Sequence, residues 1–396
     1  MKKNIGVFFG GRSVEHEISI ISALQVIKAI DKDKYDVVPV YITKDGCWYT
    51  GNWLKFIDNY RNYKLLLKRC RKITPSLDAH DGTLFAYPRG LWKRSRAVVK
   101  IDVAFPVFHG AHGEDGCFQG VFEIMNLPYV GSDVLSSAVC MSKVFTKEIS
   151  KAIGIPVLDY YSVDANRWFS DRENQIKQVS RLAFPVIVKP GNLGSSIGVG
   201  KAANVQELEN AMELAAVYSN TLLVEKCITA IREINCSVVE TVRGVEVSEC
   251  EEPVITPGKL LSFDDKYLSS ASPVEGMAGT NRKIPAGIPD ALKKEIQEYA
   301  VKIFRYLGCS GVARIDFILD TATGKVYLNE INTMPGSLAF YLWEATGKTF
   351  ATLLSEIIEQ SVKRFAQNNK LKKSFDTNVL WSINGNKLNN KLSGKL

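Results

Sequence analysis

Short apolar runs that end in glycine-rich turns alternate with segments of helical periodicity, and this alternation constrains the fold most strongly. Residues 4–9 (NIGVFF) form one such run, which stops at Gly10 and Gly11. Apolar positions then recur at helical spacing over 15–30, and a second apolar run follows at 36–42. A strand, a helix and a strand in this order pack as a parallel unit, with functional groups at the carboxyl ends of the strands. The sequence therefore predicts an α/β fold with a parallel N-terminal sheet.

The same alternation continues along the chain, interrupted by three segments without clear periodicity. These are a basic and aromatic insertion over about 50–100, an irregular stretch at 250–283, and the last thirty residues. The turn at 320–324 is predicted to join its flanking strands as a hairpin. Further strands are predicted at 103–108, 184–188, 222–225, 233–239, 312–319 and 325–331, and helices at 143–152, 205–216, 290–307 and 349–365.

Length and composition place the chain among globular proteins. With 396 residues and roughly 150 residues per domain, two or three lobes are expected. Hydrophobic residues make up 46% and charged residues 23%, which excludes a mainly disordered, collagen-like or coiled-coil chain. No apolar run approaches the roughly 18–20 residues that a membrane span requires, and the N-terminus lacks a cleavage site of small residues. We therefore expect a cytoplasmic protein with no membrane partner.

The net charge of +8 suggests a nucleic-acid partner at first sight, but the basic residues are concentrated in two places. Residues 61–100 carry a net charge of +9 and residues 361–396 carry +7, which leaves the rest of the chain at −8. Charge runs of this kind are usually solvated surface, so no nucleic-acid partner is expected. The eight cysteines are scattered without a CxxC pair, and we interpret them as reduced, mostly buried thiols.

The predicted C-terminal hairpin carries the most informative polar residues. Alternate side chains of a strand share a face, so Arg314 and Asp316 point the same way, as do Glu330 and Asn332. Carboxylate and amide oxygens of this kind suit Mg²⁺, which completes its coordination shell with phosphate oxygens. The alternative is a solvated polar face with ion pairs, although the strongly apolar neighbours favour a buried sheet.

A glycine-rich loop follows the predicted strand that ends at Lys189. Four of the ten positions 191–200 are glycine, and two adjacent serines, Ser195 and Ser196, lie between them. Glycine lets backbone N–H groups approach an anion closely and serine adds donors, so the loop suits a phosphate. It matches neither standard phosphate-loop pattern, and a flexible linker remains the alternative. A phosphate would also be a suitable partner for a lysine that ends an apolar strand.

Other polar residues at strand ends are weaker candidates by themselves. Glu15 follows the first strand and can be explained as a charge at a helix N-terminus. His109 ends another strand in a glycine-rich loop, where a functional and a structural role are equally open. Lys266 and Tyr267 lie in the irregular stretch, which is either disordered or an active-site lid. Three further charges flank one short loop and would ordinarily be solvated: Glu225, Lys226 and Glu233.

Several longer segments, in this order, resemble the D-alanine–D-alanine ligases of the ATP-grasp superfamily. The resemblance runs from about Asn4 to Phe365, whereas residues 61–100 and those beyond about 366 lie outside the family pattern. The segments that carry it are GGRSVEHEIS (10–19), FHGAHGEDGCFQG (108–120), PYVGSDVLSSAVCMSK (128–143), FPVIVKPGNLGSSIGV (184–199), LVEK (223–226), DDKYL (264–268), GCSGVARIDF (308–317) and NEINTMPG (329–336).

The resemblance implies a three-domain ATP-grasp architecture, in which two α+β lobes hold ATP between their sheets. The domains would be an N-terminal α/β domain (1–141), a central subdomain (142–232) and a C-terminal catalytic domain (233–365), followed by a flexible basic tail (366–396). It also implies ATP-dependent ligation of two D-alanine molecules through a D-alanyl phosphate, for peptidoglycan synthesis. Two Mg²⁺ ions, for which Mn²⁺ can substitute, and a homodimer are expected on the same ground.

The resemblance further assigns roles to individual residues. Glu15 would hold the ammonium of the first D-alanine beside Ser195 and Tyr267, and His109 would lie near the attacking carboxylate. Arg314 and the Gly336 N–H would form the oxyanion site. The residues assigned to the phosphates are Lys143, Lys189, Ser195, Ser196 and Lys266, those assigned to adenine and ribose are Glu225, Lys226 and Glu233, and those assigned to the metal are Asp316, Glu330 and Asn332.

One departure from the family pattern concerns the second substrate. The family usually has a Ser-Leu pair that grips the carboxylate of the acceptor, and here Tyr341 and Leu342 stand at these positions. The Tyr341 hydroxyl could replace that of serine, but its ring reaches much further. Two alternatives therefore stay open: a ligase with the same first half-reaction and another acceptor (D-serine, D-lactate or another amino acid), and an inactive homologue that binds a polyanion. The complete set of polar site residues argues against an inactive homologue.

Overall fold

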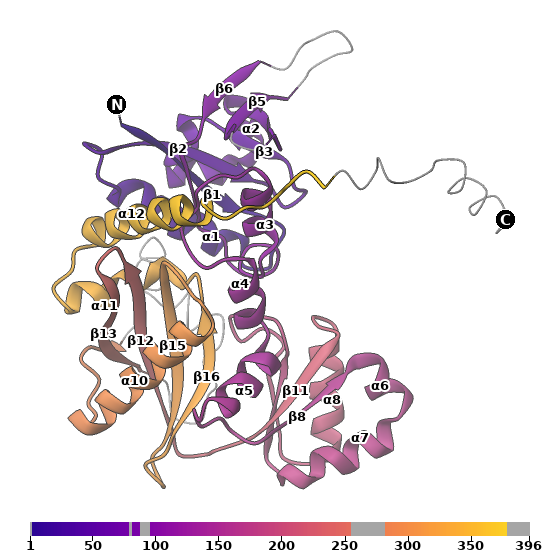
Figure 1. Cartoon of the computed structure of the whole chain (residues 1–396). Helices are drawn as coiled ribbons and strands as arrows, with labels where there is room; N and C mark the ends of the chain where they lie inside the picture. Colours follow the sequence, from indigo (N-terminus) through magenta and orange to yellow (C-terminus); the bar gives the residue numbers. More distant parts are fainter. Residues whose placement is uncertain (1, 79–80, 88–95, 255–281, 378–396) are drawn as a thin grey trace.

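The strands form three sheets in the computed structural model, which describes residues 2–78, 81–87, 96–254 and 282–377 (Figure 1). The first sheet has seven strands in the order β6-β5-β4-β3-β2-β1-β7. Its strands are β1 (Lys3–Gly10), β2 (Tyr35–Ile42), β3 (Trp48–Thr50), β4 (Arg71–Pro75), β5 (Thr83–Ala86), β6 (Ala97–Lys100) and β7 (Val103–Pro106). Among the described strands of this sheet, only the pairs β1–β2 and β1–β7 are parallel.

The prediction of a parallel N-terminal sheet is therefore correct for β2, β1 and β7 at one edge of the sheet and wrong for the rest, which is antiparallel. The segment 50–100 extends this sheet by β4, β5 and β6. Strands of four or five residues are too short to show an apolar period, which explains why the sequence did not reveal them. The segment also contains η1 (Asn52–Lys55), η2 (Ile57–Asn62) and α2 (Tyr63–Arg69).

Helices cover the first sheet and connect it to the next. They are α1 (His16–Ala29), α3 (Cys117–Ile124), α4 (Val134–Met141) and α5 (Lys143–Ala152). The C-terminal helix α12 (Phe350–Asn368) also packs here, because Leu353, Leu354 and Ile357 join the same apolar core as Ile5 and Val7 of β1. This contact ties the end of the chain to its beginning, and α12 lies beside α1 in Figure 1.

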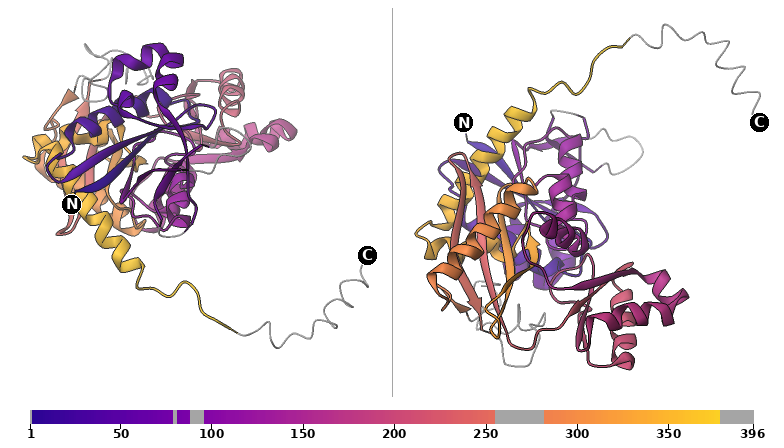
Figure 2. Two further views of the ribbon diagram at one scale, coloured as in Figure 1. Left: turned by 90° about the horizontal axis from the view of Figure 1, so that it is seen from above. Right: turned by 60° about the horizontal axis from the view of Figure 1, so that its bottom comes forward.

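The second sheet is small and antiparallel, with the order β10-β9-β11-β8. Trp168, Val188, Met212 and Val224 meet in its own apolar core. The lobe that this sheet forms with α6, α7 and α8 projects from the rest of the molecule in both views of Figure 2. Its elements are β8 (Tyr160–Asp164), α6 (Ala165–Ser170), α7 (Arg172–Val179), η3 (Ser180–Leu182), β9 (Val186–Pro190), β10 (Gly200–Ala202), α8 (Val205–Ala216) and β11 (Thr221–Lys226).

The third sheet is antiparallel, with the order β14-β13-β12-β15-β16. The predicted hairpin is confirmed, since β15 pairs with β16 across the turn at 320–324. The elements are β12 (Ile231–Thr241), β13 (Gly244–Pro253), β14 (Arg282–Lys283), α10 (Asp290–Tyr306), β15 (Val312–Asp320), β16 (Val326–Asn332), η5 (Gly336–Ala339) and α11 (Phe340–Ala345).

Among the described residues, no helix combines the length and the apolar character that a membrane crossing needs. The three sheets occupy successive stretches of the chain, but the domain boundaries at 141/142 and 232/233 remain predictions.

Candidate active site

A cavity of about 130 Å³ opens between the second and third sheets. Its walls come from β9 and β11 on one side and from β12, β13, β15 and β16 on the other. The polar residues that line it are Lys143, Lys189, Ser196, Glu225, Lys226, Glu233, Asn235, Glu251, Arg282, Arg314, Asp316, Asn329 and Glu330. Most of the residues singled out in the sequence for phosphate, adenine, ribose and metal binding therefore face one space.

The hairpin residues Arg314, Asp316 and Asn332 are bonded to one another. The Arg314 guanidinium donates from Nε and Nη2 to the two carboxylate oxygens of Asp316, both at 2.7 Å. Asn332 Nδ2 donates to Asp316 Oδ2 at 3.1 Å. Burial disfavours the charged form of Arg314, but the charge of Asp316 outweighs it and raises the pKa of Arg314. The alternative of a solvated polar face is wrong, because Arg314 and Asp316 are each only 7% exposed.

Strand register places four polar residues in one row across the third sheet. Glu251 of β13 pairs with Asn235 of β12, which pairs with Asp316 of β15, which pairs with Glu330 of β16. All four line the cavity. The row therefore presents three carboxylates and an amide to whatever the cavity holds.

Lysines from the second lobe and from α5 face this row. Lys143 Nζ lies 3.0 Å from Glu330 Oε2 and donates to the Leu193 carbonyl at 2.9 Å. Lys189 Nζ lies 2.5 Å from Glu225 Oε2 and donates to Asn329 Oδ1 at 3.0 Å. The ammonium groups of Lys143 and Lys189 are therefore held beside the glycine-rich loop, where they could bind the oxygens of a phosphate.

Glu225 forms a second ion pair, with the buried ammonium of Lys147 on α5. Burial alone would raise the pKa of Glu225, but Lys147 and Lys189 together lower it to about 2. Burial lowers the pKa of Lys147, whose side chain is only 1% exposed. Sequence reasoning missed both Lys147 and Asn329, because their partners lie on other elements far away along the chain.

The serine loop reaches across to the first sheet. Ser195 and Ser196 have left-handed backbone conformations with φ of 55° and 57°, which non-glycine residues adopt rarely and mostly at functional sites. The Ser195 hydroxyl donates to Glu15 Oε1. Glu114 lies nearby and accepts from the Gly110 N–H at 2.6 Å; burial and the charge of Glu15 raise its pKa.

His109 and the turn after β16 meet at Ser22 of α1. His109 Nε2 lies 2.8 Å from Ser22 Oγ, which also accepts from the Ser337 N–H at 3.1 Å. Burial lowers the pKa of His109 to about 4, so its ring is neutral near pH 7. Gly336 opens a turn in which Ser337, Leu338 and Ala339 all have φ near 50°. The Ser337 hydroxyl is buried and has no hydrogen-bond partner among the described residues, and a bound ligand group would supply one.

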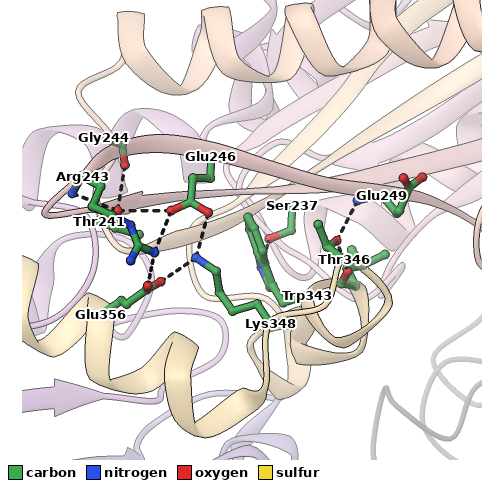
Figure 3. A network of polar contacts seen from close by, with 11 residues as sticks. Ser237, Thr241, Arg243, Gly244, Glu246, Glu249, Trp343, Thr346, Lys348 and Glu356 are labelled. Carbon is green, nitrogen blue, oxygen red and sulfur yellow. Dashed lines mark hydrogen bonds and ion pairs between the residues drawn. The ribbon is translucent and has the colours of Figure 1, made fainter.

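Tyr341 and Leu342 lie on α11, which packs against β12 and β13 of the third sheet (Figure 3). Trp343 Nε1 donates to Ser237 Oγ at 3.0 Å. Lys348 Nζ lies 2.9 Å from Glu246 Oε2 and 2.5 Å from Glu356 Oε2. Tyr341 and Leu342 are 9% and 0% exposed, so α11 holds them in one place.

Two predicted site residues, Lys266 and Tyr267, lie outside the described residues. The three residues that were predicted to bind metal, Asp316, Glu330 and Asn332, do lie in the described part, and their side chains suit Mg²⁺. Within the described part of the chain, no three His, Cys, Asp or Glu side chains are grouped to hold a metal ion. Asp316 and Glu330 supply two carboxylates beside Asn332, the number that Mg²⁺ uses when phosphate oxygens complete its shell.

Two antiparallel sheets with a lined cavity between them define the ATP-grasp fold, a class of ATP-dependent ligases. Family comparison is more specific: residues 4–132 match the family described as D-ala D-ala ligase N-terminus, and residues 149–359 match D-ala D-ala ligase C-terminus. The chain belongs to the D-alanine–D-alanine ligase family.

Individual relatives agree with this assignment. The chain is 42% identical over 378 residues to the D-alanine–D-alanine ligase of Thermosipho melanesiensis, which covers 95% of this chain and 98% of that one. It is 40% identical over 376 residues to the enzyme of the same name from Thermoanaerobacter sp. strain X514, covering 91% and 97%. Among solved structures, the D-alanine-D-alanine ligase of Coxiella burnetii has a TM-score of 0.74 at 30% identity, covering 93% and 96%. The VanG D-Ala:D-Ser ligase of Enterococcus faecalis has a TM-score of 0.74 at 29% identity, covering 91% and 100%.

Proposed function

We propose that the protein joins two D-alanine molecules to D-alanyl-D-alanine at the expense of ATP. One observation carries the proposal: the Arg314–Asp316–Asn332 group, the Lys143–Glu330 pair and Lys189 line or border a single cavity. Such a site balances the charges of a nucleotide phosphate and of a reacting carboxylate. Two relatives named D-alanine–D-alanine ligase, at 40–42% identity over most of the chain, support the same conclusion.

The chemistry explains why these residue types are needed. A carboxylate is a poor electrophile, so the donor carboxylate first attacks the γ-phosphorus of ATP and forms an acyl phosphate, with ADP leaving. The amine of the acceptor then attacks the acyl carbon, and phosphate leaves from the tetrahedral intermediate. Both steps develop negative charge on oxygen, which Lys143, Lys189, Arg314 and the Gly336 N–H would stabilise.

On the donor side, Glu15 would bind the ammonium of the first D-alanine, and Ser195 would hold the carboxylate of Glu15 in position. His109, neutral and in contact with Ser22, would face the donor carboxylate without repelling its attack on phosphorus. The Ser337 hydroxyl would donate to a substrate group, which would satisfy a buried donor for which the described part of the chain supplies no partner.

On the nucleotide side, Lys143, Lys189, Ser196 and Lys266 would bind the phosphates. Adenine and ribose would lie against Glu225, Lys226 and Glu233. Asp316, Glu330 and Asn332 would hold two Mg²⁺ ions, which supply charge stabilisation to the phosphoryl oxygens when bound. The same proposal places the enzyme in the cytoplasm as a homodimer, with a role in peptidoglycan synthesis. Its substrates would be small molecules, and nucleic acid would not be a partner.

The test is phosphate release from ATP across a panel of D- and L-amino acids and D-hydroxy acids, with the product masses determined. D-Alanine should give the highest rate and a product with the mass of D-alanyl-D-alanine. Preferential formation of D-alanyl-D-serine or D-alanyl-D-lactate would instead establish a ligase with another acceptor. Phosphate release that no member of the panel stimulates would contradict the proposal.

A further inference from the structure

The cavity is also lined by an arginine at the edge of the third sheet away from Lys143. Here Arg282 of β14 pairs with Glu251 of β13, with Nη1 2.5 Å from Oε2. Glu251 is 0% exposed, and its other oxygen accepts from Asn235 Nδ2 at 3.2 Å and from the Tyr341 hydroxyl at 3.3 Å. The Arg282 guanidinium also lies over the Tyr341 ring, 3.8 Å from its centroid.

These contacts change what Tyr341 can do. Burial raises the pKa of Tyr341, so the hydroxyl keeps its proton, and that proton is donated to Glu251. It could reach the carboxylate of a substrate only by giving up this bond. What Tyr341 offers instead is a ring face that supports the planar cation of Arg282.

The row of polar residues across the third sheet has one end for phosphate and another that could bind a carboxylate. Asp316 and Glu330 are paired with Arg314 and Lys143, at the end proposed for phosphate and metal. Glu251 lies two strand spacings from Asp316, or about 10 Å. A phosphoryl group joined through an acyl carbon to an incoming amino acid spans this length. A guanidinium carries five N–H donors in a fixed plane, so it can hold two carboxylates at once.

We propose that Arg282 binds the α-carboxylate of the acceptor amino acid and thereby selects acceptors that carry one. The inference rests on the proposed ligase function and adds a specificity-determining residue to it. The amine adds to the acyl carbon to form the tetrahedral intermediate, from which phosphate would leave toward Lys143 and Lys189, while Arg282 would hold the carboxylate of the acceptor. In this arrangement Arg282 binds the carboxylate of the acceptor. The Tyr341 ring packs against the Arg282 guanidinium, and the ion pair with Glu251 fixes the orientation of the guanidinium plane.

The experiment compares D-alanine with D-alaninamide as acceptor, with D-alanine as donor, and measures each product by mass. The quantity of interest is the ratio of kcat/KM for the two acceptors. In Arg282→Met this ratio should fall at least about tenfold, because a charge-assisted bond to the carboxylate is lost, while KM for ATP stays unchanged. The matched control is Arg232→Met, which breaks a similar pair with Glu252, at 2.7 Å for both bonds, outside the cavity lining. Its ratio should equal that of the wild type.

A second variant and a binding measurement keep the test decisive if Arg282→Met folds poorly. Arg282→Lys retains the charge beside Glu251 but loses the planar fork, so its ratio should fall severalfold. Calorimetry should show that the wild type binds D-alanyl-D-alanine more tightly than its C-terminal amide, and that both variants reduce this difference. A wild-type ratio and a wild-type difference in either variant would overturn the inference. If the wild type forms no dipeptide, the proposed function fails, and calorimetry still decides whether Arg282 recognises a carboxylate.

Discussion

The carboxylate of Glu225 offers a quantitative prediction, because it is shared by two ammonium groups in the interior. A carboxyl whose pKa falls from 4.5 to about 2 on folding stabilises the folded state by about 3 kcal/mol at neutral pH. Breaking a buried ion pair from one side typically costs about 3–5 kcal/mol, which agrees. Glu225→Gln should therefore lower the free energy of unfolding by about 3 kcal/mol at pH 7.

The contribution of Glu225 to stability should decrease as the pH falls. Because the folded pKa is depressed, the contribution is complete above about pH 4.5 and is lost as the pH falls toward 2. The difference between wild type and Glu225→Gln should therefore shrink to about 1.5 kcal/mol at pH 3. Urea unfolding can be followed through Trp168, which is fully buried in the same lobe.

Glu344→Gln is the control, since Glu344 is an exposed carboxylate on α11, and its effect should stay within about 0.5 kcal/mol. The reasoning is refuted by a loss below about 1 kcal/mol for Glu225→Gln at pH 7, or by an equal loss at both pH values.

Three further changes test other parts of the site. Glu330→Gln should reduce turnover at least about a hundredfold at saturating Mg²⁺ with the fold intact, because a metal ligand is lost, and near-wild-type turnover would remove Glu330 from the metal site. Tyr341→Ser should change KM for the acceptor much more than KM for ATP in steady-state assays, whereas equal changes would place Tyr341 outside the acceptor site. Deletion of residues 371–396 should leave activity within a few-fold, because no family segment lies there; a large loss with preserved circular dichroism would show that the tail contributes to the site or to an interface.

The sequence predicted the parts of the molecule that depend on local periodicity. The hairpin of β15 and β16 follows from two apolar runs around a turn, and alternation along each strand placed Arg314 beside Asp316. The helix predicted at 205–216 is α8. These features need only neighbours in the chain, so a pattern of a few residues defines them.

Contacts between distant elements could not be predicted in the same way. The bonds of Lys143 to Glu330 and of Lys147 to Glu225 exist because α5 packs between two sheets, which no single segment encodes. The bond from Tyr341 to Glu251 depends on how α11 lies on β13. The backbone conformation of the turn 337–339 could not be predicted from the sequence either. Three successive non-glycine residues there adopt left-handed conformations, which these residue types rarely do.

The acyl phosphate is the central claim of the mechanism, and oxygen transfer tests it most directly. D-Alanine labelled with ¹⁸O in both carboxylate oxygens is incubated with ATP, Mg²⁺ and the enzyme, and the released phosphate is analysed by mass spectrometry. Because the attacking carboxylate oxygen stays with phosphorus when the amine displaces phosphate, each phosphate released should contain one ¹⁸O atom. Unlabelled phosphate, released in step with the formation of D-alanyl-D-alanine, would contradict this account.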